Sequence, residues 1–460
     1  MLPIDDPDIW WHLRTGQWIV ARGHVPIEDP FSIFGEGKPW IAYSWLFEVL
    51  VYGLYKYFGL SGLVAFTVTM SLVVALTIHL LLRRARLTFV VEVLLLGAIF
   101  ASLKPLLSPR PWLFTILFTA MELLVVLNLR RSWKLIPALV LPMLFVLWTN
   151  LHIQFVYGLA ILAFLAVESI VHRFASSNLP HNDGRALTVT HSFLLLGSCL
   201  VATLVNPYHY GVYQAILEYV MQSGAFQNIS ELHPMFFRSL AEWLVLSLTL
   251  TGAFILGWQR RWNIFYLSLF VMASFFAFRA HRDTWFMALV VAAIVSEFAS
   301  TENYDDFFDF TKERVAALIL SLFVCLYALS HIRDVSENFL AKVVELRFPV
   351  QAVKFIKSSQ LPGPIYNSLD WGGYLIWSLP ELPVAVDGRT NLHGDERIAS
   401  SVAMWDGRIA WEKNPELLRA RLIIAQAGKP LTYLIRGDPR YRLVYEDKTA
   451  LVFVVDGSML

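Results

Sequence analysis

The sequence predicts a polytopic α-helical membrane protein with a water-soluble α/β domain at its C-terminal end. Of its 460 residues, 57% are hydrophobic and only 16% are charged, which is more apolar surface than a soluble protein of this size needs. Apolar runs of about twenty residues, the length that spans a bilayer, recur between residues 62 and 332. After residue 334 the pattern changes to short strand-like segments and amphipathic helices.

The region before the first apolar run is expected to be an external loop. Proline and glycine are dense between residues 19 and 45, which indicates a loop, and a short interfacial helix is expected over residues 45–57. Residues 1–4 are too short to be a signal peptide. The expected regions are therefore an external loop at 1–61, a transmembrane bundle at 62–333 and a soluble domain at 334–460.

The bundle is expected to contain about ten spans. They lie near residues 62–82, 88–106, 112–129, 135–151, 154–171, 190–206, 241–258, 264–279, 284–300 and 315–332. Lysine and arginine gather in alternate loops, such as those that begin at Arg83 and Arg130, and this pattern predicts that these loops are cytoplasmic. The N-terminal loop, the other connections and the soluble domain then share the opposite face. A helix preceding residue 1 would raise the count to eleven.

The soluble domain is expected to mix helices and strands. Helices are expected over 349–359 and 417–427, buried strands over 364–367 and 384–387, and a terminal hairpin over 442–455. The adjacent glycines Gly372 and Gly373, flanked by an acid and aromatic residues, predict a tight turn that can close over a substrate.

Two classes of function are disfavoured. The formal net charge of +1 argues against a nucleic-acid partner, because that binding draws on concentrated positive charge. A transporter is also disfavoured, since its polar groups would lie near mid-membrane, whereas here the polar clusters gather at one face. The two cysteines, Cys199 and Cys325, lie in apolar runs and indicate neither a structural disulfide nor a metal site.

The N-terminal segment at residues 5–16 is the first candidate site. It combines three acids with the pair Trp10 and Trp11, and tryptophan pairs suit the lipid headgroup layer. A carboxylate such as Asp8 can bind a divalent cation or act as a base. The segment is therefore a candidate catalytic or metal-binding loop at the membrane face. The alternative is an acidic, aromatic segment that carries no chemistry.

A second candidate site lies in the outward loops. Arg279, His281 and Arg282 end one span, with Asp283 as the only acid beside them, and Arg110 precedes another. Paired arginines at a membrane face suit a lipid phosphate or pyrophosphate, which accepts forked hydrogen bonds. The alternative is that these side chains extend from helix ends to the lipid headgroups.

Glu231 lies in the longest of these loops. The loop is longer than a connector between spans requires, and long loops in compact bundles are usually functional or disordered. Glu231 is therefore a candidate functional acid, and the alternative is a solvated loop residue.

Together these stretches resemble the GT-C superfamily of membrane glycosyltransferases, most of all the catalytic subunit of oligosaccharyltransferase. The first external loop of that family reads D-P-x-F-N-Y-R-A-T-x-Y-L-V, and residues 8–20 here read D-I-W-W-H-L-R-T-G-Q-W-I-V. The family's S-V-S-E-H-Q-P loop is matched by N-I-S-E-L-H-P at 228–234. Its W-W-D-Y-G signature is matched in part by S-L-D-W-G at 368–372, and its D-N-N-T segment by D-G-R-T at 387–390.

The resemblance implies roles for individual residues. It implies that Asp8 and Glu231 are catalytic and that both bind a divalent metal, Mn²⁺ or Mg²⁺. The residues expected to bind the acceptor are Trp11, His12, Arg14, Asp370, Trp371, Tyr374 and Asp387. The residues expected to bind the donor phosphate are Arg110, Arg279, His281 and Arg282. The chain lacks a second D-x-D segment, so a metal-independent transfer with Asp8 as base also stays open. It also lacks both tryptophans of W-W-D-Y-G, which argues against Asn-x-Ser/Thr as the acceptor.

The expected function is inverting transfer of a sugar from a polyprenyl-(di)phosphate donor to an extracytoplasmic protein or glycan acceptor. The expected partners are this lipid-linked donor and membrane lipids, in a bacterial-type inner membrane with the active face towards the periplasm. The alternative is a non-catalytic scaffold that binds lipid-linked sugars on the same fold.

Overall fold

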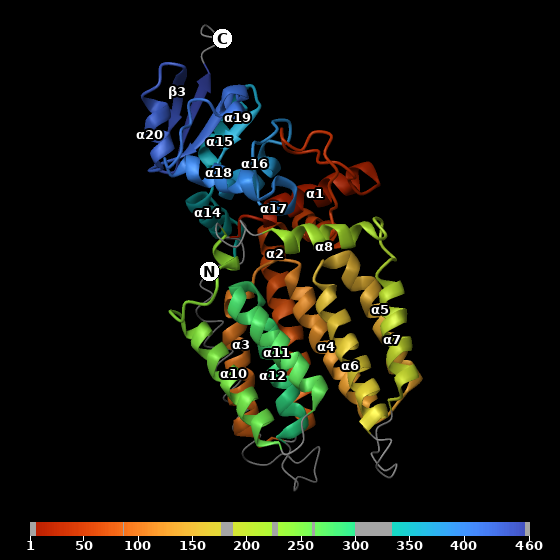
Figure 1. Ribbon diagram of the computed structural model, residues 1–460. Coiled ribbons are helices and arrows are strands. Elements are labelled where there is room, and N and C mark those ends of the chain that lie inside the picture. The colour runs from red at the N-terminus through yellow and green to blue at the C-terminus, as the bar shows by residue number, and fades with distance from the viewer. Residues whose placement is uncertain are drawn as a thin grey trace. The chain divides into compact units, whose positions relative to one another are not determined.

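The computed structural model describes residues 6–85, 87–175, 187–222, 229–259, 263–299 and 334–455. Its contacts divide the chain into two compact units. Unit 1 comprises Met1–Phe66, Tyr210–Ser230 and Val335–Leu460, and unit 2 comprises Thr67–His209 and Glu231–Asp334. Figure 1 labels many of the helices of both units, and strand β3.

Unit 2 is built from apolar helices. Its described elements are the C-terminal part of α2 (Trp45–Leu82), η2 (Arg83–Ala85), α3 (Phe89–Leu103), η3 (Lys104–Leu106), α4 (Trp112–Arg131), α5 (Leu135–Leu151), α6 (Phe155–Ala175), α7 (Val189–Ala202), η5 (Ser230–Leu232), α10 (Leu240–Trp258), α11 (Ile264–Arg279), η6 (His281–Asp283) and α12 (Thr284–Phe298). Helix α12 is buried from Thr284 to Ser296, and it packs on α3, α4, α10 and α11.

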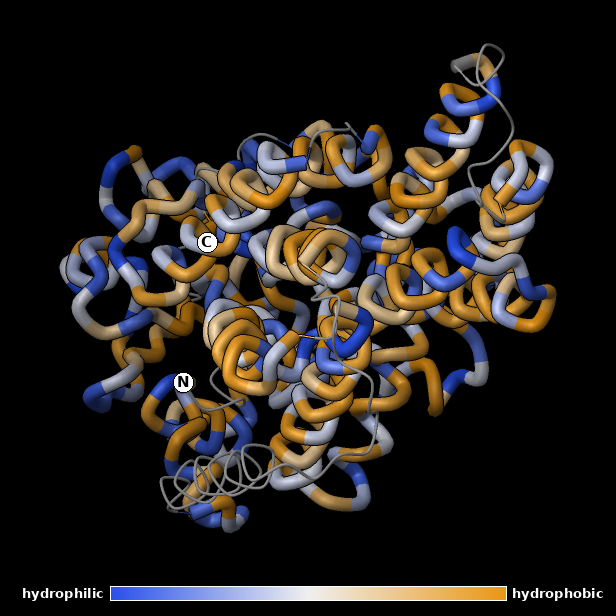
Figure 2. The backbone as a smooth tube through the Cα atoms, turned by 90° about the horizontal axis from the view of Figure 1, so that it is seen from below, coloured by the Kyte–Doolittle hydropathy of each residue, from blue (hydrophilic) through white to orange (hydrophobic). Residues whose placement is uncertain are grey.

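The described helices fit a helical membrane protein. Five are long and apolar enough to cross a membrane, judged by length and composition: Trp45–Ala85, Phe89–Leu106, Trp112–Arg131, Phe155–Phe174 and Leu240–Trp258. Large apolar side chains on the bundle helices, such as Leu94, Met143 and Phe254, are exposed, and Figure 2 shows these helices largely in the hydrophobic colour. An apolar exterior of this kind suits contact with lipid chains.

Nine of the ten predicted spans coincide with helices in the part of the chain that the structure describes. Some are too short to cross a bilayer unaided, such as α7 with 14 residues, so the number of spans stays a prediction. The tenth predicted span, at 315–332, lies outside the described residues.

Helix α2 is kinked at Gly59, which has φ 61° and ψ −151°. Glycine adopts this positive φ without the steric cost that a Cβ would bring. Beyond the kink, the carboxylate of Glu337 accepts hydrogen bonds from the backbone N–H groups of Leu60 at 3.1 Å and Ser61 at 3.3 Å. The kink thus separates the predicted short helix at 45–57 from the first predicted span, and Glu337 caps the second part.

Unit 1 combines N-terminal helices with a small α/β arrangement. Its elements are α1 (Ile9–Arg22), the first part of α2, α8 (Gly211–Met221), α14 (Glu337–Arg347), α15 (Val350–Ser358), β1 (Ile365–Asn367), α16 (Leu369–Ser378), α17 (Thr390–His393), α18 (Asp395–Trp405), α19 (Pro415–Arg419), β2 (Leu422–Gln426), α20 (Pro430–Arg436), β3 (Tyr441–Glu446) and β4 (Ala450–Val455). The sheet has the order β1-β2-β4-β3, with β1 parallel to β2 and the other pairs antiparallel.

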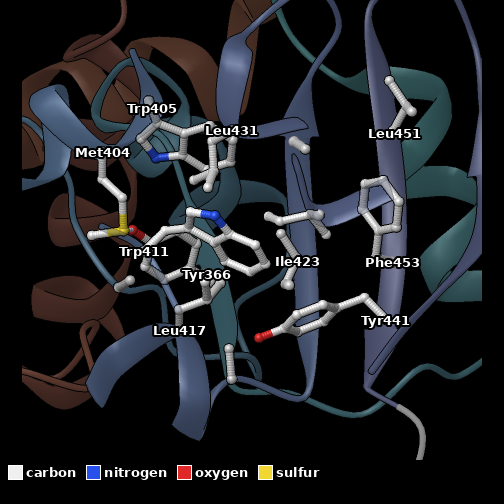
Figure 3. Packing of buried hydrophobic residues seen from close by; sticks show 14 residues of the cluster. Tyr366, Met404, Trp405, Trp411, Leu417, Ile423, Leu431, Tyr441, Leu451 and Phe453 are labelled. Carbon is white, nitrogen blue, oxygen red and sulfur yellow. Dashed lines mark hydrogen bonds between the residues drawn. The ribbon is translucent and has the colours of Figure 1, made fainter. Parts of the chain in front are cut away.

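One face of this sheet carries an aromatic core, drawn in Figure 3. Ile423 of β2 lies opposite Phe453 of β4, and both side chains are fully buried. Tyr366 stacks on Trp405 with ring centroids 5.7 Å apart. Burial of large aromatic side chains is a major source of stability in so small a sheet.

Three predicted elements of the C-terminal region are wrong. The predicted helix at 417–427 holds the last residues of α19 and then the inner strand β2, because a short apolar run fits a buried strand as well as a helix. The predicted strand at 384–387 forms only isolated bridges, from Val384 to Ser32 and Ile365. The predicted turn at Gly372 and Gly373 is part of helix α16.

The N-terminal segment also differs from its prediction. Residues expected in an external loop form helix α1, whose buried residues include Ile9, Leu13 and Ile19. Ile9 and Leu13 are four residues apart, which places them on one face of a helix, a pattern that the polar neighbours obscured.

Candidate functional site

Asp8 lies where the chain enters α1. It occupies the N-cap position of that helix, and its backbone N–H donates to Asp6 Oδ1 over 2.9 Å. The half-buried carboxylate lies against Gly388, because a Cβ built on Gly388 would overlap Asp8 Oδ1 and would lie 3.0 Å from Asp8 Cγ. Position 388 therefore accepts only glycine while Asp8 keeps this place.

The two tryptophans after Asp8 belong to the core of unit 1. Trp10 is 3% exposed and Trp11 is 7% exposed. Trp10 packs edge-on against Phe348 and Tyr374, with ring centroids 5.7 Å and 5.2 Å away. The prediction that the pair lies in the lipid headgroup layer is therefore wrong, since buried rings contact neither lipid nor water.

Two glycines of α16 allow close packing, Gly373 against α1 and Gly372 against residues 386–387. A Cβ built on Gly373 would lie 3.3 Å from Trp11 Cδ1, and one built on Gly372 would lie 2.6 Å from the Cα of Asp387. The second distance is shorter than side-chain contacts permit, so Gly372 has a packing role. The predicted substrate-covering turn is instead a packing contact of α16 with α1 and with residues 386–387.

The predicted acceptor residues of α16 differ in exposure. Asp370 is exposed, whereas Trp371 and Tyr374 are buried. The indole N–H of Trp371 donates to the carbonyl of Arg347 over 3.2 Å. Asp370 is thus the member of this set that faces solvent in unit 1.

His12 and Arg14 both have partners nearby. His12 Nδ1 lies 3.3 Å from Glu48 Oε1, and both side chains are buried. Arg14 Nη1 donates to Gln17 Oε1 over 2.6 Å. These contacts fix the two predicted acceptor residues on opposite sides of α1.

Arg389 joins the N-terminal and C-terminal parts of unit 1. Its Nη1 donates to Asp29 Oδ1 at 2.5 Å, while Nε and Nη2 donate to the two carboxylate oxygens of Asp387 at 2.8 Å and 2.7 Å. His393 Nε2 lies 3.1 Å from Asp387 Oδ2. The ring of Trp40 lies 4.6 Å from the guanidinium. We call Asp29, Asp387, Arg389 and His393 the Arg389 cluster; all four side chains are at most 1% exposed.

Mutual attraction keeps Asp387 and Arg389 ionised. Burial raises the pKa of Asp387, but the Arg389 guanidinium and His393 outweigh burial and hold the pKa below its ordinary 3.8. Burial lowers the pKa of Arg389, and the charges of Asp387 and Asp29 raise it by more. Asp387, predicted to bind the acceptor, is therefore an ionised internal partner of Arg389.

In unit 2 the predicted catalytic acid Glu231 and the predicted phosphate ligand Arg110 form a forked ion pair. Arg110 Nη2 donates to Glu231 Oε1 at 3.1 Å, and Nη1 donates to Oε2 at 3.3 Å. The guanidinium also lies 4.6 Å from the ring centroid of Trp112. A phosphate bound by Arg110 would share this guanidinium with Glu231.

Glu242 is a second acid of unit 2 that sequence reasoning missed. It accepts hydrogen bonds from the backbone N–H groups of Phe236, Arg238 and Ser239 at 2.8–3.0 Å. Its Oε1 lies 3.4 Å from His281 Nδ1. The expectation that Asp283 is the only acid beside these cations is therefore wrong. The sequence signal was present, because Ser239 and Glu242 form a capping box at the start of α10.

Asp283 is buried at the start of α12. Gln154 Nε2 donates to its Oδ1 over 3.0 Å. Burial raises the pKa of Asp283, against the opposing charge of Arg282 and, more weakly, Arg279. The predicted arginines thus share one end of unit 2 with a carboxylate that partly balances their charge.

The predicted site residues are divided between the two units. Unit 1 contains Asp8 and the predicted acceptor residues, and unit 2 contains Glu231 and the predicted phosphate ligands. Among the residues that the structure describes, no group of three or more His, Cys, Asp or Glu side chains could hold a metal ion. A hard divalent cation needs several oxygen ligands. The described residues therefore do not fit the predicted Mn²⁺ or Mg²⁺ site.

Comparison with known proteins supports the fold. No family model matches the sequence, and no curated protein matches it. The chain resembles archaeal oligosaccharyltransferase AglB from Archaeoglobus fulgidus, solved in complex with an inhibitory peptide and a dolichol-phosphate. The TM-score is 0.53 at 12% identity, over 98% of this chain and 71% of that chain.

Two further solved structures are similar. The apo form of the Archaeoglobus fulgidus oligosaccharyltransferase gives a TM-score of 0.53 at 13% identity, over 92% of this chain and 66% of that chain. ArnT from Cupriavidus metallidurans in the apo state gives 0.49 at 15% identity, over 98% of this chain and 94% of that chain. The predicted resemblance to oligosaccharyltransferase is thus confirmed at the level of the fold.

Proposed function

We propose that this protein is a membrane glycosyltransferase that moves a sugar from a polyprenyl-(di)phosphate donor to an extracytoplasmic acceptor. The observation that carries the proposal is the fold shared with an oligosaccharyltransferase over 98% of the chain, in a structure described with a dolichol-phosphate. The membrane is a bacterial-type inner membrane, and the active face is periplasmic.

Asp8 is the general base of the proposed reaction. Its carboxylate takes the proton of the acceptor nucleophile as that atom attacks the anomeric carbon of the donor. The bond from the anomeric carbon to the phosphate oxygen breaks on the opposite side, so the configuration inverts. The support from the structure is that Asp8 is half-buried at the N-cap of α1 and that its carboxylate lies against Gly388, since a base must be fixed within reach of its proton.

The cations of unit 2 stabilise the departing phosphate. Negative charge grows on this group as the bond breaks, and guanidinium groups fixed in advance lower the barrier. Arg279 and Arg282 are proposed as the principal ligands, with Arg110 and His281 beside them. Glu231 orients Arg110 through the forked pair at 3.1 Å and 3.3 Å.

The test is sugar release by purified protein in detergent. A panel of labelled polyprenyl-phosphate and polyprenyl-diphosphate sugars is offered with and without Mn²⁺ or Mg²⁺. Wild type is expected to release free sugar slowly to water, and Asp8→Asn to lose at least about a hundredfold of this rate, as removal of a general base does. Glu446→Gln is the matched control, because Glu446 is an exposed acid paired with Arg436.

The alternative function is a non-catalytic scaffold for lipid-linked sugars. Its support is that the described residues hold no metal-ligand group. If the protein is a scaffold, wild type and Asp8→Asn should bind a donor from the panel equally well, and neither should release sugar. Sugar release by Asp8→Asn at the full wild-type rate would instead refute the role of Asp8 as base, while the conclusion that the protein is an enzyme would stand.

A further inference from the structure

We propose that the Arg389 cluster positions Asp8, with Gly388 as the surface against which the carboxylate rests. The inference rests on the proposed function, because it assigns positioning residues to the acid proposed as base. It replaces the expectation that Asp387 binds the acceptor.

The contact between Asp8 and Gly388 is direct. A Cβ at position 388 would overlap Asp8 Oδ1 and would lie 3.3 Å from Trp11 Nε1. The backbone of Gly388 thus lies against both the carboxylate and the first turn of α1. A displacement of this backbone would move the carboxylate or leave it without its support.

Both chain neighbours of Gly388 are fixed by the Arg389 cluster. The Arg389 side chain donates two hydrogen bonds to the Asp387 carboxylate, and the backbone N–H of Arg389 donates a third to Asp387 Oδ1 over 3.0 Å. Asp387 and Arg389 therefore close a small ring around Gly388 that leaves its backbone little freedom. Buried, charge-assisted hydrogen bonds of this kind restrict geometry more than exposed ones do.

The cluster is in turn tied to residues 29–33. Asp29 accepts hydrogen bonds from the backbone N–H groups of Phe31 and Ser32, both at 3.1 Å, in addition to its bond with Arg389. The segment after Phe31 pairs with the C-terminal region through Ile33 N–H and the carbonyl of Val384, at 3.0 Å. The support against which Asp8 rests is thus fixed both to residues 29–33 and to the C-terminal region.

A disulfide measures this placement without any enzyme assay. In a full-length chain with Cys199 and Cys325 replaced by alanine, Asp8→Cys and Gly388→Cys place two thiols in reach of each other. The Asp8 Cγ lies 3.0 Å from the Cβ position of residue 388, so the two Cβ atoms lie within about 4.5 Å, as a disulfide requires. We expect rapid oxidation of this pair, measured by mass spectrometry.

Arg389→Lys then tests the cluster. Lysine keeps the positive charge but cannot make the fork, so the 8–388 disulfide is expected to form at least about tenfold more slowly. A reference disulfide at Arg442→Cys and Val454→Cys, which lie opposite each other on β3 and β4, should form at an unchanged rate. Arg436→Lys is the matched control, because its exposed pair with Glu446 is far less confined.

Each outcome decides the proposal. Selective slowing of the 8–388 disulfide supports it. Three results would overturn it. The 8–388 disulfide does not form even with Arg389 intact, or it forms at an unchanged rate in Arg389→Lys. In the third, both disulfides slow equally, which indicates that the whole of unit 1 has become less rigid. In chains that keep Asp8, Gly388→Ala should lower sugar release about tenfold with the donor KM unchanged. If wild type releases no sugar, the proposed function fails, and the disulfide result still stands or falls separately.

Discussion

Replacing Arg389 with methionine should be among the most damaging single changes in unit 1. The substitution keeps much of the side-chain volume and removes the charge, so the carboxylates of Asp29 and Asp387 remain buried without their shared partner. Both carboxylates have 0% exposed side chains, and water cannot replace the guanidinium.

The expected loss follows from the cost of an unpaired buried charge. Breaking a buried ion pair by removing one partner costs about 3–5 kcal/mol. For a domain of 150–250 residues each kcal/mol shifts Tm by roughly 2–4 °C, so the melting temperature should fall by roughly 6–20 °C. The neutral combination Asp29→Asn, Asp387→Asn and Arg389→Met should recover much of this loss, because no uncompensated charge remains.

The assay is intrinsic tryptophan fluorescence during heating of the purified full-length protein in detergent. Arg436→Met is the matched control, since an exposed ion pair is worth about 0–1 kcal/mol, and it should melt within about 3 °C of wild type. A melting temperature for Arg389→Met equal to that of this control would refute the reasoning. Failure of the neutral combination to recover would show that packing, not charge, dominates at the cluster.

Three further predictions concern other contacts. Folding lowers the pKa of Asp387, so its ionised carboxylate stabilises the folded state above pH 3.8, and this contribution is lost as the pH falls below that value. The melting temperature of Asp387→Asn should therefore depend less on pH in this acid range than that of wild type. Gly372→Ala should lower stability by about 1–3 kcal/mol in chemical unfolding, because its Cβ would lie 2.6 Å from the Cα of Asp387, whereas Gly97→Ala, with open space around it, should not. Glu231→Gln should leave Arg110 less well oriented and weaken binding of a polyprenyl-phosphate several-fold at equilibrium; unchanged or tighter binding would contradict the orienting role proposed for Glu231.

The sequence predicted the helices of unit 2 well, because a long apolar segment has few alternatives to a buried or lipid-facing helix. The hairpin at 442–455 was also confirmed, as β3 and β4. The segment at 417–427 was not, because an apolar run of five residues carries no period that separates a strand from a helix. Its place at the centre of the sheet, between β1 and β4, decided the outcome.

For the candidate site, residue types alone indicated Asp8, Glu231 and the outward arginines as candidate functional residues. Pairing was beyond the sequence, since it depends on which distant segments meet. Only the tertiary structure shows that Asp29 pairs with Arg389 across 360 positions, that Glu231 pairs with Arg110, and that Gly388 contacts Asp8. The physical reason is that a local pattern fixes the face on which a side chain lies, whereas its partner, and thus its charge state and its role, is chosen by long-range packing.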